Sequence, residues 1–271
     1  MHRFSPAVFA ALTLTLAACP PAADTTGEGE GEGEGEGGGE GEGEGEGEGE
    51  GEGEGEGEGE GEGEGEGEGE AGGFGVIDAC PDIDDALISE TPSFFVNALD
   101  FGDDAYDDGE LSRLTPGAQE ILSEGTAGGD SGLSEAFAFE ILARCESAVL
   151  YKSETEVIYD PPTSKKTDIV VDIGAVRYGV SVVRALTFPR GGVFTTDEAT
   201  RLLTKKLGDI HFSTANAVEA DRWTKQVLSV IADQPEYVDV WRTIWAGLDN
   251  DLKGDTVVYV TVTNGADAPL Y

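Results

Sequence analysis

Apolar residues recur with helical spacing from Gly132 to Ser147 and in short runs after that segment. In the first segment Phe137, Ile141 and Cys145 are four residues apart, which predicts an amphipathic helix. The runs that follow predict strands, and Gly174-Ala175 predicts the turn of a hairpin. The four predicted strands cover residues 148–151, 156–159, 168–173 and 176–185.

Helical and strand patterns then alternate to the end of the chain. Thr195 and Glu198 have the spacing of a capping box and predict a helix that ends at Gly208. Later runs predict a short strand at 210–212, a strand at 227–231, a helix at 236–248 and a strand at 256–262. Prolines at three positions predict loops and short helices over residues 80–128. This order predicts an α/β (mixed α+β) fold, in which a central mixed β-sheet is flanked by helices.

The N-terminus has the pattern of an export signal. A basic start and an apolar run end in Leu16-Ala17-Ala18-Cys19, which resembles the bacterial lipobox. The resemblance implies a lipoprotein signal peptide over 1–18, a lipid-anchored N-terminus over 19–26 and lipidation of Cys19. Pro20 favours the outer membrane as the place of anchoring. The alternative is an ordinary secretory signal in which Cys19 occurs by chance.

Residues 27–70 are a Gly-Glu tract with 21 Glu and 23 Gly. Such a segment has no apolar side chains to bury, and its charges repel one another, so we expect residues 27–73 to be a disordered spacer. The 44 residues could span roughly 150 Å when fully extended. A weak store of divalent cations is a second use for so many carboxylates. Residues 74–271 are then expected to form a single globular α/β domain.

The charge of the chain limits its partners. The whole sequence has 56 acids and 16 bases, and residues 71–271 alone have 34 acids and 15 bases. A domain with this net charge would repel a phosphate backbone, so we do not expect broad binding of nucleic acid.

Two cysteines remain besides Cys19. In an exported protein Cys80 and Cys145 are expected to form a disulfide, and two free buried thiols are the alternative. His211 is the single histidine after the signal peptide, and no cluster of Cys and His has the spacing of zinc ligands.

The order of elements over residues 132–262 resembles that of the PD-(D/E)xK nuclease-like superfamily, with a restriction-endonuclease-like core. Glu140 lies on the leading helix, and Lys166-Thr167-Asp168 stands where that superfamily has its first strand acid. The segment from Gly179 to Arg184 stands where it has (D/E)xK. The resemblance implies that Glu140 and Asp168 would bind Mg²⁺ or Mn²⁺ and that Arg184 would replace the lysine.

The register of the hairpin departs from the superfamily pattern. A two-residue turn places Asp168 on the face of Ser181 and Val183 and directs Arg184 to the opposite face. Asp172 shares the face of Asp168, which gives an irregular candidate site of Glu140, Asp168, Asp172 and Arg184. Simple ion pairs are the alternatives: Glu140 with Arg144 on the helix surface, and Asp172 with Arg177 across the strands.

Two functions follow as expectations. The first is an envelope lipoprotein that presents a non-catalytic module for binding an unknown protein or envelope ligand, with no cofactor and with the membrane as partner through lipidated Cys19. The alternative is a metal-dependent nuclease or phosphodiesterase of the PD-(D/E)xK type, which would require Mg²⁺ or Mn²⁺.

Overall fold

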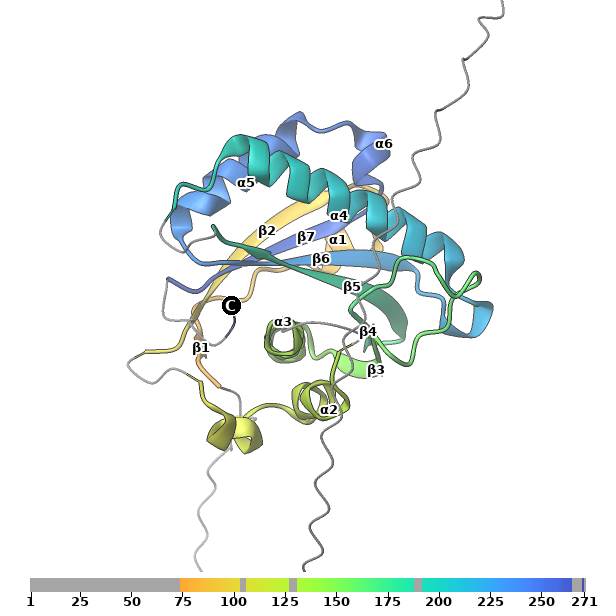
Figure 1. Ribbon diagram of the computed structural model, residues 1–271, viewed down its shortest axis with the longest axis horizontal. Coiled ribbons are helices and arrows are strands. Elements are labelled where there is room, and N and C mark those ends of the chain that lie inside the picture. Colours follow the sequence, from red (N-terminus) through yellow and green to blue (C-terminus); the bar gives the residue numbers. More distant parts are fainter. Residues whose placement is uncertain (1–73, 103–105, 127–130, 188–191, 265–269, 271) are drawn as a thin grey trace, which may run out of the picture. The chain divides into compact units, whose positions relative to one another are not determined.

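The computed structural model describes residues 74–271 except 103–105, 127–130, 188–191, 265–269 and 271. These residues form a seven-stranded mixed sheet with helices on both faces (Figure 1), so the predicted fold class is confirmed. The strands are β1 (Val76–Ile77), β2 (Ser93–Asp100), β3 (Val149–Ser153), β4 (Ile169–Ile173), β5 (Val176–Ala185), β6 (Lys225–Ala232) and β7 (Val257–Val262). The helices are α1 (Asp84–Ile88), α2 (Pro116–Glu124), α3 (Gly132–Glu146), α4 (Thr196–Asn216), α5 (Pro235–Gly247) and α6 (Asn250–Lys253), with 3₁₀ segments η1 (Asp108–Arg113) and η2 (Glu219–Asp221).

The strand order across the sheet is β1-β2-β7-β6-β5-β4-β3. The strands β2, β7, β6 and β5 are parallel, and the antiparallel pairs lie at the two edges. The central strands β6 and β7 are buried along their whole length. Their nearly continuous apolar sequences are typical of parallel strands that are covered on both faces.

Alternate residues of the central strands point into two separate cores. Val227 and Ile231 of β6 pack with α2 and α3 on the concave face of the sheet (Figure 1). Leu228 and Val230 point the other way and pack with α4 and α5, where Trp241 is fully buried. Since each helix covers one face, the sheet holds α3 and α4 on opposite sides of β5.

The hairpin prediction is confirmed in its register. Ile173 pairs with Val176 across the two-residue turn, and Gly174 has a positive φ of 59°, which glycine adopts without strain. Asp172 is therefore opposite Arg177. The capping box of Thr195 and Glu198 is also present at the start of α4.

Four predictions of elements or their ends are wrong. Residues 93–100, expected in a region of loops and short helices, form β2, which pairs with β7 far along the chain. Residues 156–159 are not a strand and make one isolated bridge, from Tyr159 to Ala217. Helix α4 passes through Gly208 and includes residues 210–212, because Leu207 and Ile210 continue its buried face.

Among the residues described, no helix combines the length and the apolar character that crossing a bilayer requires. The expected signal peptide, the segment that resembles a lipobox with Cys19, and the Gly-Glu tract lie outside the described residues.

Candidate functional site

A polar cavity of about 420 Å³ lies next to the start of β4, where residues of α3, β5 and α4 meet. Strand β5 continues to Ala185, whereas its pairing with β4 stops at Val180. The part of β5 past that point forms a wall of the cavity, which we call the cleft. Three acids and two bases are among the residues that line the cleft: Ser131, Ser134, Glu135, Glu154, Asp168, Val182, Val183, Arg184, Leu186 and Lys206.

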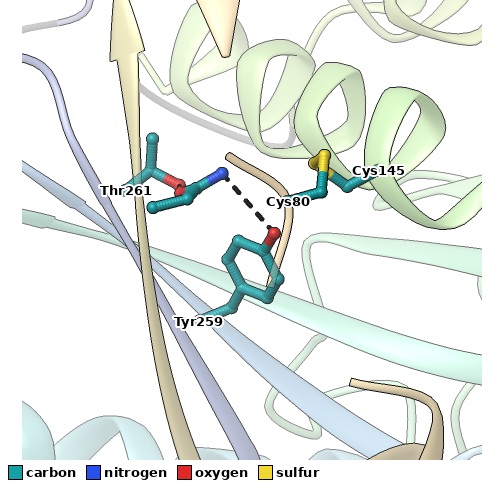
Figure 2. The surroundings of a disulfide bond; sticks show 5 residues. Cys80, Cys145, Tyr259 and Thr261 are labelled. Carbon is teal, nitrogen blue, oxygen red and sulfur yellow. Dashed lines mark hydrogen bonds between the residues drawn. A yellow bond between two sulfur atoms is a disulfide. The ribbon is translucent and has the colours of Figure 1, made fainter. Parts of the chain in front are cut away.

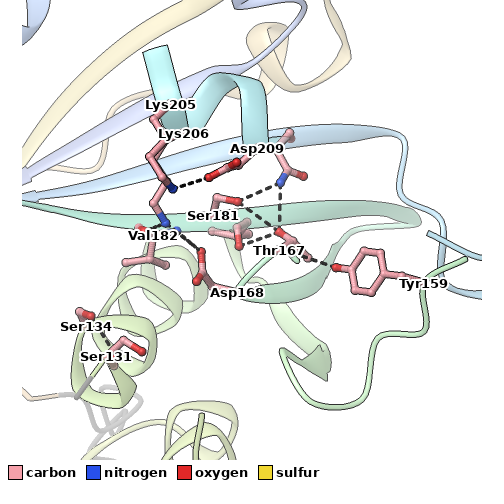
Figure 3. Close-up of polar contacts among 12 residues, drawn as sticks. Ser131, Ser134, Tyr159, Thr167, Asp168, Ser181, Val182, Lys205, Lys206 and Asp209 are labelled. Atoms are coloured by element: carbon pink, nitrogen blue, oxygen red, sulfur yellow. Dashed lines mark hydrogen bonds and ion pairs between the residues drawn. The ribbon is translucent and has the colours of Figure 1, made fainter. Parts of the chain in front are cut away.

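Asp168 lies one residue before β4 and is held by the backbone of β5. Its N–H donates to the carbonyl of Val180 (3.1 Å), and its carboxylate accepts from the N–H of Val182 (2.6 Å). Oδ2 of Asp168 is 3.8 Å from Nζ of Lys206 (Figure 3). Burial raises the pKa of Asp168, and the ammonium group of Lys206 opposes that rise.

Two bases reach the cleft from different elements. Lys206 comes from α4, and its Nζ donates to the carbonyl of Val182 (2.7 Å). Both peptide groups of Val182 lie on the edge of β5 that β4 leaves unpaired; the N–H holds Asp168 and the carbonyl holds Lys206. Arg184 comes from β5, and its Nη1 donates to the carbonyl of Leu270 (3.2 Å).

Glu135, in the first turn of α3, is an acid of the cleft that the sequence prediction missed. Only 2% of Glu135 is exposed. Burial raises its pKa to about 7; a hydrogen bond with Ser131 lowers the pKa, and the charges of Asp168 and Glu154 raise it further. At neutral pH the cleft therefore contains a carboxyl group that can either accept or donate a proton.

Glu140, the predicted acid of the leading helix, does not line the cleft. Its side chain is fully buried, and Oε2 accepts from the N–H (2.9 Å) and the hydroxyl (2.6 Å) of Thr115, the residue that caps α2. Oε1 of Glu140 is 3.9 Å from Nη1 of Arg144, so the ion pair considered from the sequence is present, although Glu140 is buried rather than at the helix surface. The described contacts give Glu140 a role in joining α3 to α2.

Asp172 is also separate from the cleft. Nε of Arg177 is 3.0 Å from its Oδ1, which is the cross-strand pair considered from the sequence. The Arg177 guanidinium also lies over the ring of Tyr151, 3.1 Å from its centroid. Of the four predicted site residues, the structure brings Asp168 and Arg184 together in the cleft, and Glu140 and Asp172 lie elsewhere.

The acids of the cleft fit a divalent cation only in part. As the side chains stand, no three carboxylate, imidazole or thiolate groups within the described ranges are close enough to bind one metal ion. Proteins often bind Mg²⁺ through one or two carboxylates, with water and substrate phosphate completing the ligand set. Glu135 and Asp168 could hold Mg²⁺ or Mn²⁺ in that way.

The predicted disulfide joins Cys80 to Cys145, with the sulfurs 2.05 Å apart (Figure 2). Cys145 lies in the last turn of α3, so the bond fixes the segment after β1 to the C-terminal end of the helix that carries Glu135.

The chain is 39% identical over 153 residues to the AAC-rich mRNA clone AAC4 protein of Dictyostelium discoideum. The match covers 54% of this chain and 22% of that protein, so the chain spans about a fifth of its relative's length. No family model and no solved structure matches the chain.

Proposed function

We propose that the protein is a bacterial envelope lipoprotein that presents its α/β domain as a binding module, with the cleft as its ligand site. The lipobox at Leu16–Cys19 supports the anchor, and the Gly-Glu tract supports a spacer between the lipid and the domain. The observation that carries the binding role is the cleft, a polar cavity lined by two bases, Arg184 and Lys206, and by the acids Glu135, Glu154 and Asp168. A ligand that carries an anionic group, alone or with a cation, suits this arrangement.

Lipidation of Cys19 is tested by expressing the full chain in a bacterium that processes lipoproteins. We expect mass spectrometry of the mature N-terminus to find an acylated Cys19 and fractionation to find the protein in the membrane. The control is Cys19→Ala, which should release an unacylated, soluble chain from the membrane. An unacylated product of the natural sequence would contradict the proposed anchor.

A metal-dependent phosphodiesterase is a second candidate, favoured by Glu135 and Asp168 lying in one cavity with two bases. In such a reaction Mg²⁺ or Mn²⁺ would polarise the phosphate and activate water. Arg184 and Lys206 would bind the phosphate oxygens. With Arg184 in place of the lysine of (D/E)xK, Val182 stands where that motif has its acid. The acids that could hold the ion therefore come from α3 and from the start of β4 rather than from β5.

The cleft is tested by titration of the chain with Mn²⁺ and by hydrolysis of a simple aryl phosphodiester. We expect Asp168→Asn to weaken Mn²⁺ binding at least tenfold and to abolish any hydrolysis, since it removes a charge that faces the cavity. Asp172→Asn is the matched control, because it makes the same change on β4 outside the cleft. Mn²⁺ binding that survives Asp168→Asn would exclude the cleft as the metal site. Binding without hydrolysis would favour the binding module.

A further inference from the structure

A buried polar network lies directly behind Asp168. Nε2 of Gln226, on β6, donates to the hydroxyl of Thr167 (3.0 Å) and to that of Ser181 (3.2 Å). Thr167 is fully buried and only 2% of Gln226 is exposed. Figure 3 shows Thr167 between Ser181 and Tyr159, with Asp168 next to it.

The network fixes both the side chain and the backbone of Thr167. The N–H of Thr167 donates to the hydroxyl of Tyr159 (2.8 Å), and its own hydroxyl donates to the carbonyl of Val180 (3.0 Å). That carbonyl also accepts from the N–H of Asp168. Thr167, the residue before Asp168, is therefore held by the side chains of Tyr159 and Gln226 and by the backbone carbonyl of Val180.

This arrangement has a cost within the core. Oε1 of Gln226 is buried and has no hydrogen-bond partner among the described residues. A buried carbonyl without a donor is destabilising, and such groups in folded proteins call for an explanation. Room for the amide exists because Gly179 lies opposite on β5, where any Cβ would overlap Oε1 of Gln226 and the ring of Trp223.

We infer that Gln226 is a positioning residue of the cleft, which holds the carboxylate of Asp168 on the N–H of Val182 by clamping Thr167. The role rests on the proposed function of the cleft as the ligand site. Gln226 itself is absent from the residues that line the cleft, so it acts through Thr167 rather than by touching a ligand.

The test is Gln226→Met in the full chain, which keeps the volume of the side chain and removes its donors. Amide hydrogen exchange of Val182, followed by NMR, reports the position of Asp168 without any ligand. We expect exchange at Val182 to be at least tenfold faster in the variant and Mn²⁺ to bind at least fivefold more weakly. The matched control is Thr261→Val, which removes a buried hydroxyl that donates to Oδ1 of Asn97 (2.7 Å) in the core near the disulfide (Figure 2).

The outcomes separate the two proposals. Unchanged exchange at Val182 in Gln226→Met, or equal acceleration in Thr261→Val, would overturn the role of Gln226. Absence of Mn²⁺ binding by the natural chain would remove the metal-dependent function, while exchange at Val182 would still decide the role of Gln226. If Gln226→Met does not fold, Tyr159→Phe removes the acceptor of the Thr167 N–H, and the same local acceleration is expected.

Discussion

Glu135 and Glu140 of α3 show that the position of an acid on a helix decides whether it lines the cleft or joins two helices. Glu135 and Glu140 are five residues apart on one helix, and the sequence alone made Glu140 the candidate. The structure buries Glu140 against Thr115 and places Glu135 in the cleft. The helix is buried on nearly every side, so its apolar pattern did not distinguish the face that meets α2 from the one that meets the cleft. The two acids differ in the residues that surround them in the folded protein, and these residues are distant in sequence.

Glu135 should make the stability of the protein depend on pH. Its pKa rises from an ordinary value of 4.5 to about 7 in the folded protein, so the native state binds more protons than the unfolded chain between these values. Stability from this group is therefore greatest below pH 4.5 and falls until about pH 7. Glu135→Gln removes the ionisation, and we expect the variant to be more stable than the natural protein at pH 8 by up to about 3 kcal/mol.

Urea unfolding at pH 5 and at pH 8 measures this effect. The gain from Glu135→Gln should be several times larger at pH 8 than at pH 5. Glu124→Gln, at an exposed position of α2, should follow the natural protein at both values. If Glu135→Gln changes stability equally at both values, the carboxyl is not protonated by burial. The same substitution should weaken Mn²⁺ binding in the cleft at pH 8, since it removes a carboxylate that is ionised above about pH 7.

At the scale of elements, the sequence pattern predicted strand pairing correctly where the two strands are adjacent in the chain. The two-residue turn fixed the register of β4 and β5, and the pairing of Asp172 with Arg177 followed from it. The long elements α3, β5, α5 and β7 were also predictable because each has a clear period, whereas the short strands predicted at 156–159 and 210–212 are absent. Strand β2 was missed because its partner β7 lies about 160 residues further along the chain, and Pro92 suggested a loop. Helix α4 was predicted too short because Gly208 suggested an end, although no positive φ is needed there.

The cleft depends on a mismatch in strand length that the sequence pattern did not reveal. Strand β4 begins at Ile169, so the last five residues of β5 have no strand partner on that side. Asp168 and Lys206 take the free peptide groups of Val182 instead. Lys206 could be predicted to lie on a helix, but its approach to β5 required the packing of α4 across the sheet. Asp168 and Arg184 were within reach of sequence analysis because both belong to the hairpin.

At the scale of the whole molecule, the disulfide connects the start of the domain to its core. Cys80 follows the expected spacer by only a few residues, and Cys145 is at the end of α3. The two-residue strand β1 pairs only with Asp100 and Leu99, so hydrogen bonds alone would hold this entry segment weakly. If the protein is tethered through the spacer, a force applied to the spacer would be transmitted through the disulfide to α3.

Replacing both cysteines by serine, in Cys80→Ser/Cys145→Ser, should therefore loosen the entry segment and lower the stability of the domain. The bond closes a loop with a sequence separation of 65 residues, which corresponds to about 4 kcal/mol in the chain-entropy account. Urea unfolding measures the loss, and limited proteolysis should show faster cleavage near residue 80 in the variant. Glu124→Gln, at an exposed position of α2, is the control, since it leaves the disulfide intact. A double variant as stable and as resistant to protease as the natural chain would mean that packing of Phe74 against Phe101 and Phe137, rather than the disulfide, secures the entry segment.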